Sequence, residues 1–201
     1  MSNPEPRERH VFLARHGETE WSRLGRHTGR TDLPLTDIGR EQATTLGDRL
    51  AENRFALVLT SPLSRAAETA RLAGFGTTVT AEPDLQEWDY GDLEGRRSDE
   101  IRADMPGWTI WRGPWPGAET IGEVAMRADR VIARARAVDG DVLLFSHGHL
   151  LRILAARWLG QDATAGGNFA LATATLSVLG WERGAPVIER WNEACGPGLR
   201  G

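Results

Sequence analysis

Val11-Phe12-Leu13-Ala14-Arg15-His16-Gly17-Glu18-Thr19 is the stretch that decides the fold, because a short apolar run ends there at an arginine, a histidine and a glycine. Four consecutive apolar residues are typical of a strand that is covered on both faces of a sheet. In open parallel sheets, ligands bind beyond the carboxyl ends of such strands. We therefore predict a buried strand that delivers Arg15 and His16 to a functional site.

The same pattern occurs at two further places in the chain. Leu57-Val58-Leu59 runs into Thr60-Ser61-Pro62 and reaches Arg65, and Val142-Leu143-Leu144-Phe145 runs into Ser146-His147-Gly148-His149. An arginine fork matches phosphate oxygens and stays charged at any working pH. An imidazole beside it can attack phosphorus or move a proton. If the three runs deliver these side chains to one rim, two arginines and two histidines meet there, which indicates phosphoryl transfer through a histidine.

The stretch Arg15-His16-Gly17-Glu18-Thr19 resembles the signature of the histidine phosphatase superfamily, which includes cofactor-dependent phosphoglycerate mutases and fructose-2,6-bisphosphatases. The resemblance continues in the family's order from residue 10 to about residue 180. Its further segments are Thr28-Gly29 and residues 35–43, 61–70, 87–91, 94–95 and 146–148. It implies an α/β fold of three layers, in which helices cover both faces of a mostly parallel central sheet. It also implies catalysis without a metal or other cofactor.

Length and composition predict one domain over residues 1–201, with flexible ends at 1–9 and 194–201. The chain has a net charge of −4 and all its basic residues are arginine, so nucleic acid is not expected as a partner and Schiff-base chemistry is excluded. We expect neither a signal peptide nor a membrane span in the polar N-terminus. The one cysteine, Cys195, fits a reducing cytoplasm. The sequence does not decide between a monomer and a homodimer.

Hydrophobic periodicity predicts that strands and helices alternate, as in layered α/β proteins. Further strands are expected at 56–60, 79–81, 142–146, 174–181 and 186–191. Thr36 is expected to cap a helix that ends near Asn53, and Ser61 with Pro62 is expected to start another. More helices are expected from Ser98, over 121–135 and near 149–159, whereas residues 18–36 and 105–118 read as loops.

The resemblance implies that His16 carries a transient phosphoryl group. On the local sequence alone, a buried histidine bonded to the backbone is an equally good interpretation. Arg15 and Arg65 are expected to clamp the phosphate, and His147 with the backbone of Gly148 is expected to hold its equatorial oxygens. A surface ion pair is the ordinary alternative for either arginine.

Three weaker phosphate contacts are also implied. Thr28 and Gly29 match a segment that contacts phosphate in relatives, although a turn explains the Thr-Gly pair as well. Ser22 stands where relatives often carry an asparagine, and we expect its hydroxyl to give one hydrogen bond in place of the amide.

Glu87 is the expected general acid and base, because an alkoxide leaving group needs a proton and the later attack by water needs a base. A solvated loop glutamate is the ordinary alternative, and Asp89 is a second candidate for the same role. Trp88 and Arg112 are expected to contact the substrate, with Arg112 gripping a second phosphate or a sugar hydroxyl.

Three functional alternatives remain from the sequence. His147-Gly148-His149 has a spacing that can ligate zinc, but two arginines compete for that space. Phosphoglycerate mutases carry a longer basic segment between the glutamate and the second histidine than the interval from Gly95 to His147 holds, so we prefer a phosphatase. A non-catalytic protein that binds phospho-ligands would not need Glu87.

The substrate is expected to be a small phosphate ester, a sugar phosphate or bisphosphate. This expectation rests on residues 23–29, 87–91 and 108–112, which resemble a branch that contains bacterial acid phosphatases and a sedoheptulose-1,7-bisphosphatase.

Overall fold

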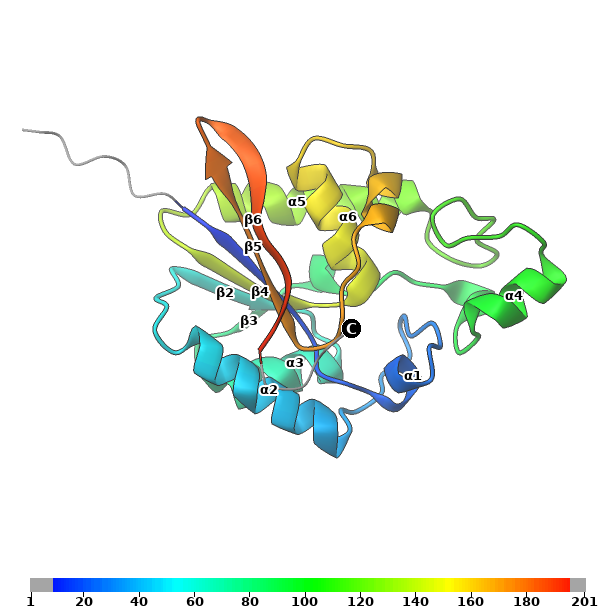
Figure 1. Cartoon of the computed structure of the whole chain (residues 1–201), viewed down its shortest axis with the longest axis horizontal. Coiled ribbons are helices and arrows are strands. Elements are labelled where there is room, and N and C mark those ends of the chain that lie inside the picture. Colours follow the sequence, from blue (N-terminus) through cyan, green and yellow to red (C-terminus); the bar gives the residue numbers. More distant parts are fainter. Residues whose placement is uncertain (1–8, 196–201) are drawn as a thin grey trace, which may run out of the picture.

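The computed structural model describes residues 9–195, and its strands form one sheet in the order β3-β2-β4-β1-β5-β6 (Figure 1). The strands are β1 (Val11–Arg15), β2 (Leu57–Thr60), β3 (Thr80–Ala81), β4 (Val142–Ser146), β5 (Thr175–Glu182) and β6 (Ala185–Ala194). The first four are parallel, and β5 and β6 form an antiparallel hairpin beside β1. The sheet is therefore mixed and mostly parallel, as the sequence predicts.

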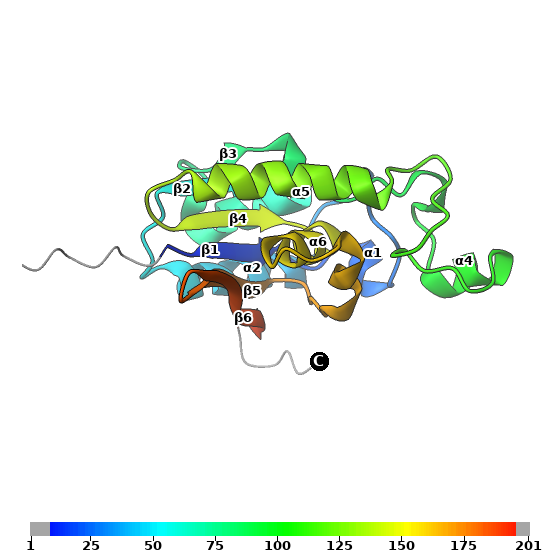
Figure 2. The ribbon, with the colours of Figure 1, turned by 90° about the horizontal axis from the view of Figure 1, so that it is seen from above.

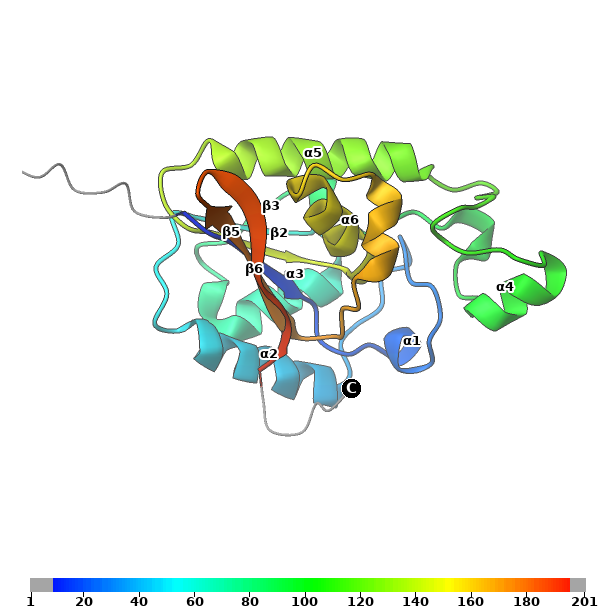
Figure 3. The same ribbon diagram turned by 45° about the horizontal axis from the view of Figure 1, so that its top comes forward.

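The α-helices are α1 (Glu20–Arg23), α2 (Asp37–Leu50), α3 (Ser64–Ala70), α4 (Ser98–Asp104), α5 (Ile121–Arg136) and α6 (Gly148–Trp158). Figure 3 shows α5 and α6 on one face of the sheet and α2 and α3 on the other. This arrangement confirms the predicted three-layer α/β fold. In Figure 2, α1 and α4 lie away from the layers, beyond the end of the sheet at which β1 and β4 finish.

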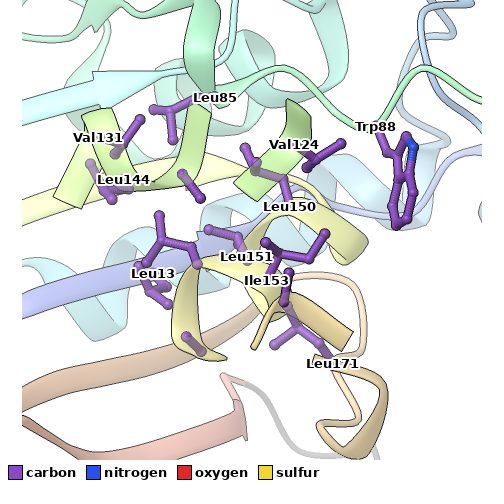
Figure 4. Packing of buried hydrophobic residues seen from close by; sticks show 14 of the residues in the cluster. Leu13, Leu85, Trp88, Val124, Val131, Leu144, Leu150, Leu151, Ile153 and Leu171 are labelled. Atoms are coloured by element: carbon purple, nitrogen blue, oxygen red, sulfur yellow. The ribbon is translucent and has the colours of Figure 1, made fainter. Parts of the chain in front are cut away.

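Alternate residues of the central strands enter two separate cores, because both faces of the sheet are covered. Leu13 and Leu144 pack with α5 and α6, in the core drawn in Figure 4. Phe12 and Leu143 point the other way and pack with α2. All four of these side chains are at most 4% exposed, which explains why the strands read as continuous apolar runs.

Several boundaries differ from the sequence prediction. Thr36 caps α2 as predicted, and its hydroxyl accepts a hydrogen bond from the Gly39 N–H. The predicted helix start at Ser61 is wrong: α3 begins at Ser64, because Leu63 is its N-cap residue and still has an extended backbone. The Ser61 hydroxyl lies before the helix, where it accepts from the Leu63 N–H and bonds to the ring of a buried histidine. The short helix α1 lies within residues 18–36, which the sequence assigned to a loop.

The expected flexible ends, 1–9 and 194–201, lie outside the described residues except for Arg9, Ala194 and Cys195, and Ala194 belongs to β6. None of the helices between residues 9 and 195 is long and apolar enough to cross a membrane.

The register of the sheet brings the ends of three parallel strands together. Arg15 at the end of β1 pairs with Ser146 at the end of β4, and Thr60 at the end of β2 pairs with Phe145. The first residues beyond the strands continue this pairing: the His16 N–H donates to the Ser146 carbonyl at 3.0 Å. The segments that follow β1, β2 and β4 carry the predicted catalytic residues. They therefore start from one edge of the sheet, where ligands bind in folds of this type.

Two glycines allow the segment after β1 to lie directly on α2. A Cβ atom on Gly17 would lie 2.3 Å from the carbonyl oxygen of Gly39, and a Cβ on Gly39 would lie 2.1 Å from the carbonyl oxygen of Glu18. Neither distance is tolerable between non-bonded atoms, and both neighbours are backbone. The position of His16 thus depends on two residues that have no side chain.

We expect Gly39→Ala to destabilise the protein by roughly 1–3 kcal/mol, the usual range for overpacking, and to lower any activity that depends on His16. Gly122→Ala in α5 is the matched control, because its new Cβ meets nothing closer than 3.9 Å. That change should be neutral or stabilise the protein by about 0.4–1 kcal/mol. Urea unfolding of both variants checks this, and an equal loss in the two would contradict the close-packing argument.

Candidate active site

A cavity of about 450 Å³ opens at the carboxyl edge of β1 and β4. The predicted site residues that line it are Arg15, His16, Ser22, Thr28, Glu87 and Gly148. Arg65 and His147 have no exposed surface and lie next to His16: the rings of His147 and His16 are 5.1 Å apart. The structure therefore brings the expected nucleophile, acid and cations to one place.

The ring of His16 is held in one neutral tautomer. Its Nδ1 lies 2.7 Å from the Gly17 carbonyl oxygen, which can only accept a hydrogen bond, so Nδ1 carries the proton. The lone pair is then on Nε2. Burial lowers the pKa of His16 well below its ordinary value, and the charges of Arg65 and Arg15 lower it further. His16 is thus a neutral imidazole with a free nitrogen, as a nucleophile must be.

Arg15 lines the cavity. Its Nη1 donates to the Leu171 carbonyl, but its buried Nε has no partner within the described residues. A Cβ atom on Gly148 would lie 3.2 Å from the Arg15 guanidinium carbon, so glycine at this position lets the guanidinium lie against the start of α6. An unsatisfied buried N–H is costly, and a phosphate oxygen would satisfy it.

Arg65 and His147 are buried side by side, and both side chains form hydrogen bonds to other groups of the protein. The Nε–H of Arg65 donates to Nδ1 of His147 at 3.2 Å, so the proton of the neutral imidazole is on Nε2, which lies 2.7 Å from the Ser61 hydroxyl. Burial and the Arg65 charge hold the pKa of His147 well below its ordinary value. The remaining bonds of Arg65 go to the carbonyl oxygens of Thr28, Gly29 and Thr31.

The carboxylate of Glu87 is bound by backbone donors. Its Oε1 accepts from the Trp88 N–H and the Leu150 N–H, both at 2.9 Å, and its Oε2 accepts from the His149 N–H at 3.0 Å. Two of these donors are in the first turn of α6, whose own cap residue, His147, makes no capping bond with its side chain. Glu87 therefore caps α6 from a distant segment, and this fixes its carboxylate beside the cavity.

A buried ion pair holds the segment that carries Glu87. Arg127 on α5 binds Glu119 through two hydrogen bonds of 2.8 and 2.9 Å. The same guanidinium donates to the carbonyl oxygens of Asp84 and Gln86. This ion pair was not predictable from the sequence, because neither partner lies near a recognisable motif.

Two histidines and a tyrosine form one wall of the cavity. The rings of His27 and His149 stack with centroids 5.9 Å apart, and Nδ1 of His149 lies 2.6 Å from the Tyr90 hydroxyl. Burial lowers the pKa of His27 to about 4 and holds that of His149 well below its ordinary value. From the sequence, His149 was a candidate zinc ligand only, and no role was predicted for His27 or Tyr90.

The geometry argues against a zinc site at His147 and His149. Both ring nitrogens of His147 already bond to Arg65 and Ser61, and Nδ1 of His149 bonds to Tyr90. Residues 9–195 contain no group of three or more His, Cys, Asp or Glu side chains that could hold a metal ion.

The other predicted ligands have mixed positions. Ser22 lines the cavity, but its hydroxyl donates to the Thr19 carbonyl within α1. Gly29 does not line it, and its N–H donates to Glu94. Trp88 is fully buried, does not line the cavity and donates its indole N–H to the Glu119 carbonyl, so the structure does not bring this expected substrate contact to the site. Arg112 lines an adjoining hollow that shares Thr109 and Trp111 with the cavity.

Comparisons with known proteins agree with this geometry. The model of the histidine phosphatase superfamily (branch 1) matches residues 11–194. An acid phosphatase of Mycobacterium tuberculosis is 41% identical over 182 residues, covering 89% of each chain. The sedoheptulose 1,7-bisphosphatase of Saccharomyces cerevisiae is 35% identical over 74% of this chain and 67% of its own. A solved structure of an open reading frame from M. tuberculosis has a TM-score of 0.89 at 39% identity and covers 94% of this chain and 99% of its own.

We expect stability to fall as the pH drops from 6.5 towards 4. The unfolded state protonates His27 near pH 6.5, whereas the folded state keeps it neutral down to about pH 4, so the unfolded state binds more protons in this window. One such group gives a slope of at most about 1.4 kcal/mol per pH unit. Urea unfolding at several pH values measures this slope, which His27→Gln should reduce. An NMR titration midpoint of His27 near 6.5 would contradict the argument.

Proposed function

Because the chain belongs to branch 1 of the histidine phosphatase superfamily, we propose that it is a metal-independent phosphatase that hydrolyses small phosphate monoesters through a phosphohistidine on His16. The observation that carries this proposal is the tautomer of His16. Its bond to the Gly17 carbonyl leaves the lone pair on Nε2, and the same cavity is lined by Arg15, whose Nε has no partner within the described part of the chain.

In the first step, Nε2 of His16 attacks phosphorus and the bond from phosphorus to the ester oxygen breaks. The departing oxygen takes the proton of the Glu87 carboxyl group, which enters this step protonated and leaves it as a carboxylate, and the phosphoryl group stays on His16. In the second step, Glu87 takes a proton from water, which attacks phosphorus and breaks the bond to Nε2. Inorganic phosphate leaves, and both side chains return to their starting state.

Arg15, Arg65, His147 and the Gly148 backbone stabilise the charge on the phosphoryl oxygens in this proposal. Arg15 lines the cavity, and its buried Nε lacks a hydrogen-bond partner among residues 9–195. His147 must exchange its bond to Ser61 for one to phosphate, since both of its nitrogens bond to protein groups in the structure. Thr28 and Ser22 line the cavity and are further proposed contacts.

The cavity walls support a sugar phosphate or bisphosphate as substrate. Trp108, Ile110 and Trp111 supply apolar surface that suits the C–H faces of a sugar, while His149 supplies a polar edge for hydroxyls. The similarity to an acid phosphatase and to a sedoheptulose 1,7-bisphosphatase supports the same class. The single cysteine supports a cytoplasmic location.

We expect His16→Ala to abolish turnover while the protein stays folded. Brief incubation of the native enzyme with substrate and an alkaline quench should trap acid-labile phosphate on His16, and chelators should leave activity intact. Phosphate on a serine or aspartate would contradict the mechanism.

The product with 3-phosphoglycerate and its bisphosphoglycerate primer separates the alternatives: phosphate release supports a phosphatase, dominant isomerisation supports a mutase, and no reaction with any ester supports a phospho-ligand binder.

We expect Glu87→Gln to slow hydrolysis of sugar phosphates by roughly 10²–10⁴-fold, because the proton donor is lost. Aryl phosphates, whose leaving groups need no proton, should lose much less. Asp89→Asn is the matched control, since Asp89 lies outside the cavity and its Oδ1 accepts from the Gly91 N–H. Glu87→Gln also alters the cap of α6, so the thermal unfolding of this variant must be compared with that of the native protein. An equal loss with both kinds of ester would make Glu87 a structural residue.

A further inference from the structure

The arginines of the cavity differ from those of the surface in their partners. On the surface, carboxylates neutralise many arginines, as in the pairs Arg23–Glu20 and Arg130–Asp84, each at 2.7 Å. The arginines that line the cavity are Arg15, Arg26, Arg102 and Arg152. None of these four has a carboxylate oxygen within 4.0 Å among residues 9–195.

Three of these arginines come from segments other than the strand edge that holds His16. Arg26 follows α1, Arg102 is on α4 and Arg152 is on α6. Figure 2 shows α1 and α4 beyond the end of the sheet. Because Arg102 is a residue of α4, it reaches the cavity lining from outside the three layers.

Protein groups hold two of these guanidinium groups in place but do not neutralise them. Arg152 donates to the carbonyl oxygens of Gly166 and Gly167 and lies over the Trp111 ring, 4.5 Å from its centroid. Arg26 donates to the Gly95 carbonyl at 2.6 Å. Arg102 is exposed on α4, and its side chain has no hydrogen-bond partner among residues 9–195. Each side chain therefore keeps unused N–H donors and its full charge.

The reacting phosphoryl group does not account for this charge. A phosphate monoester carries about −1.5 to −2 near pH 7, and Arg15 and Arg65 at the strand edge are sufficient to balance it. Glu87 is the single carboxylate among the lining residues, and three backbone N–H groups already bind it. Arg26, Arg102 and Arg152 in the cavity wall thus remain without an anionic partner among the residues that the structure describes.

We propose that Arg26, Arg102 and Arg152 form a second anion subsite, which binds a phosphate group carried by the leaving group of the substrate. This proposal rests on the phosphatase function proposed above. Three guanidinium groups match a dianionic phosphate better than a single carboxylate, because their forks donate to several oxygens at once. The preferred substrates are then bisphosphates, and the subsite holds the phosphate that is not transferred to His16.

The test compares fructose 1,6-bisphosphate with fructose 1-phosphate and fructose 6-phosphate. In the native enzyme, kcat/KM for the bisphosphate should exceed that for the better monophosphate at least tenfold. Arg102→Gln and Arg26→Gln should each lower this ratio about tenfold, the size of a lost charge-assisted hydrogen bond. Because Arg102 is exposed, its variant should fold normally. Raising the ionic strength should also lower the ratio in the native enzyme.

Arg54→Gln is the matched control, since Arg54 is an exposed arginine before β2, at the opposite end of the sheet. This variant should leave the ratio of the two kcat/KM values unchanged. An unchanged ratio in both Arg26→Gln and Arg102→Gln, with p-nitrophenyl phosphate still hydrolysed, would overturn the subsite but not the phosphatase. Failure to hydrolyse any ester would overturn the phosphatase itself. A preference for 3-phosphoglycerate that the same variants abolish would assign the subsite to carboxylates and overturn the bisphosphate proposal.

Discussion

The guanidinium of Arg65 is the interaction on which the rest of the site depends. It is fully buried, and it joins the three segments that follow β1, β2 and β4. Arg65 itself follows β2, it donates to the carbonyl oxygens of residues 28, 29 and 31 in the segment after β1, and its Nε donates to His147 after β4. A buried cation without acceptors is severely destabilising, so each of these segments is required to keep the others in place.

This buried charge also sets the state of the two central histidines. Desolvation disfavours imidazolium, and the charges of Arg65 and Arg15 disfavour it further, so both His16 and His147 stay neutral. Each ring then has one N–H and one lone pair, and its hydrogen bonds decide which nitrogen has which. His16 donates to a carbonyl and keeps a free lone pair, whereas His147 accepts from Arg65 and keeps an N–H. The same cation therefore prepares one ring to attack and the other to donate.

The sequence could predict the inner part of the site because its residues follow directly from strand ends. A buried strand is recognisable from its apolar run, and the residues that follow it must lie at the edge of the sheet. The positions of Arg15, His16 and His147 could therefore be predicted from the sequence. The positions of Arg26, Arg102 and Arg152 in the cavity wall could not be predicted, because these residues come from three separate segments that meet only in the folded chain. Trp88 shows the opposite failure: it was expected to contact the substrate, but its side chain is fully buried and belongs to the core on the α5 and α6 face.

The choice between Glu87 and Asp89 shows what tertiary structure adds to a local pattern. Both carboxylates lie in one short segment, and only the resemblance to a family separated them. In the fold, the first turn of α6 needs an acceptor because the ring of its cap residue, His147, is occupied by Arg65 and Ser61. Glu87 meets that need, so the helix that follows the second histidine also fixes the carboxylate beside the first. Asp89 binds the N–H of Gly91 within its own turn and is thereby kept away from the reaction.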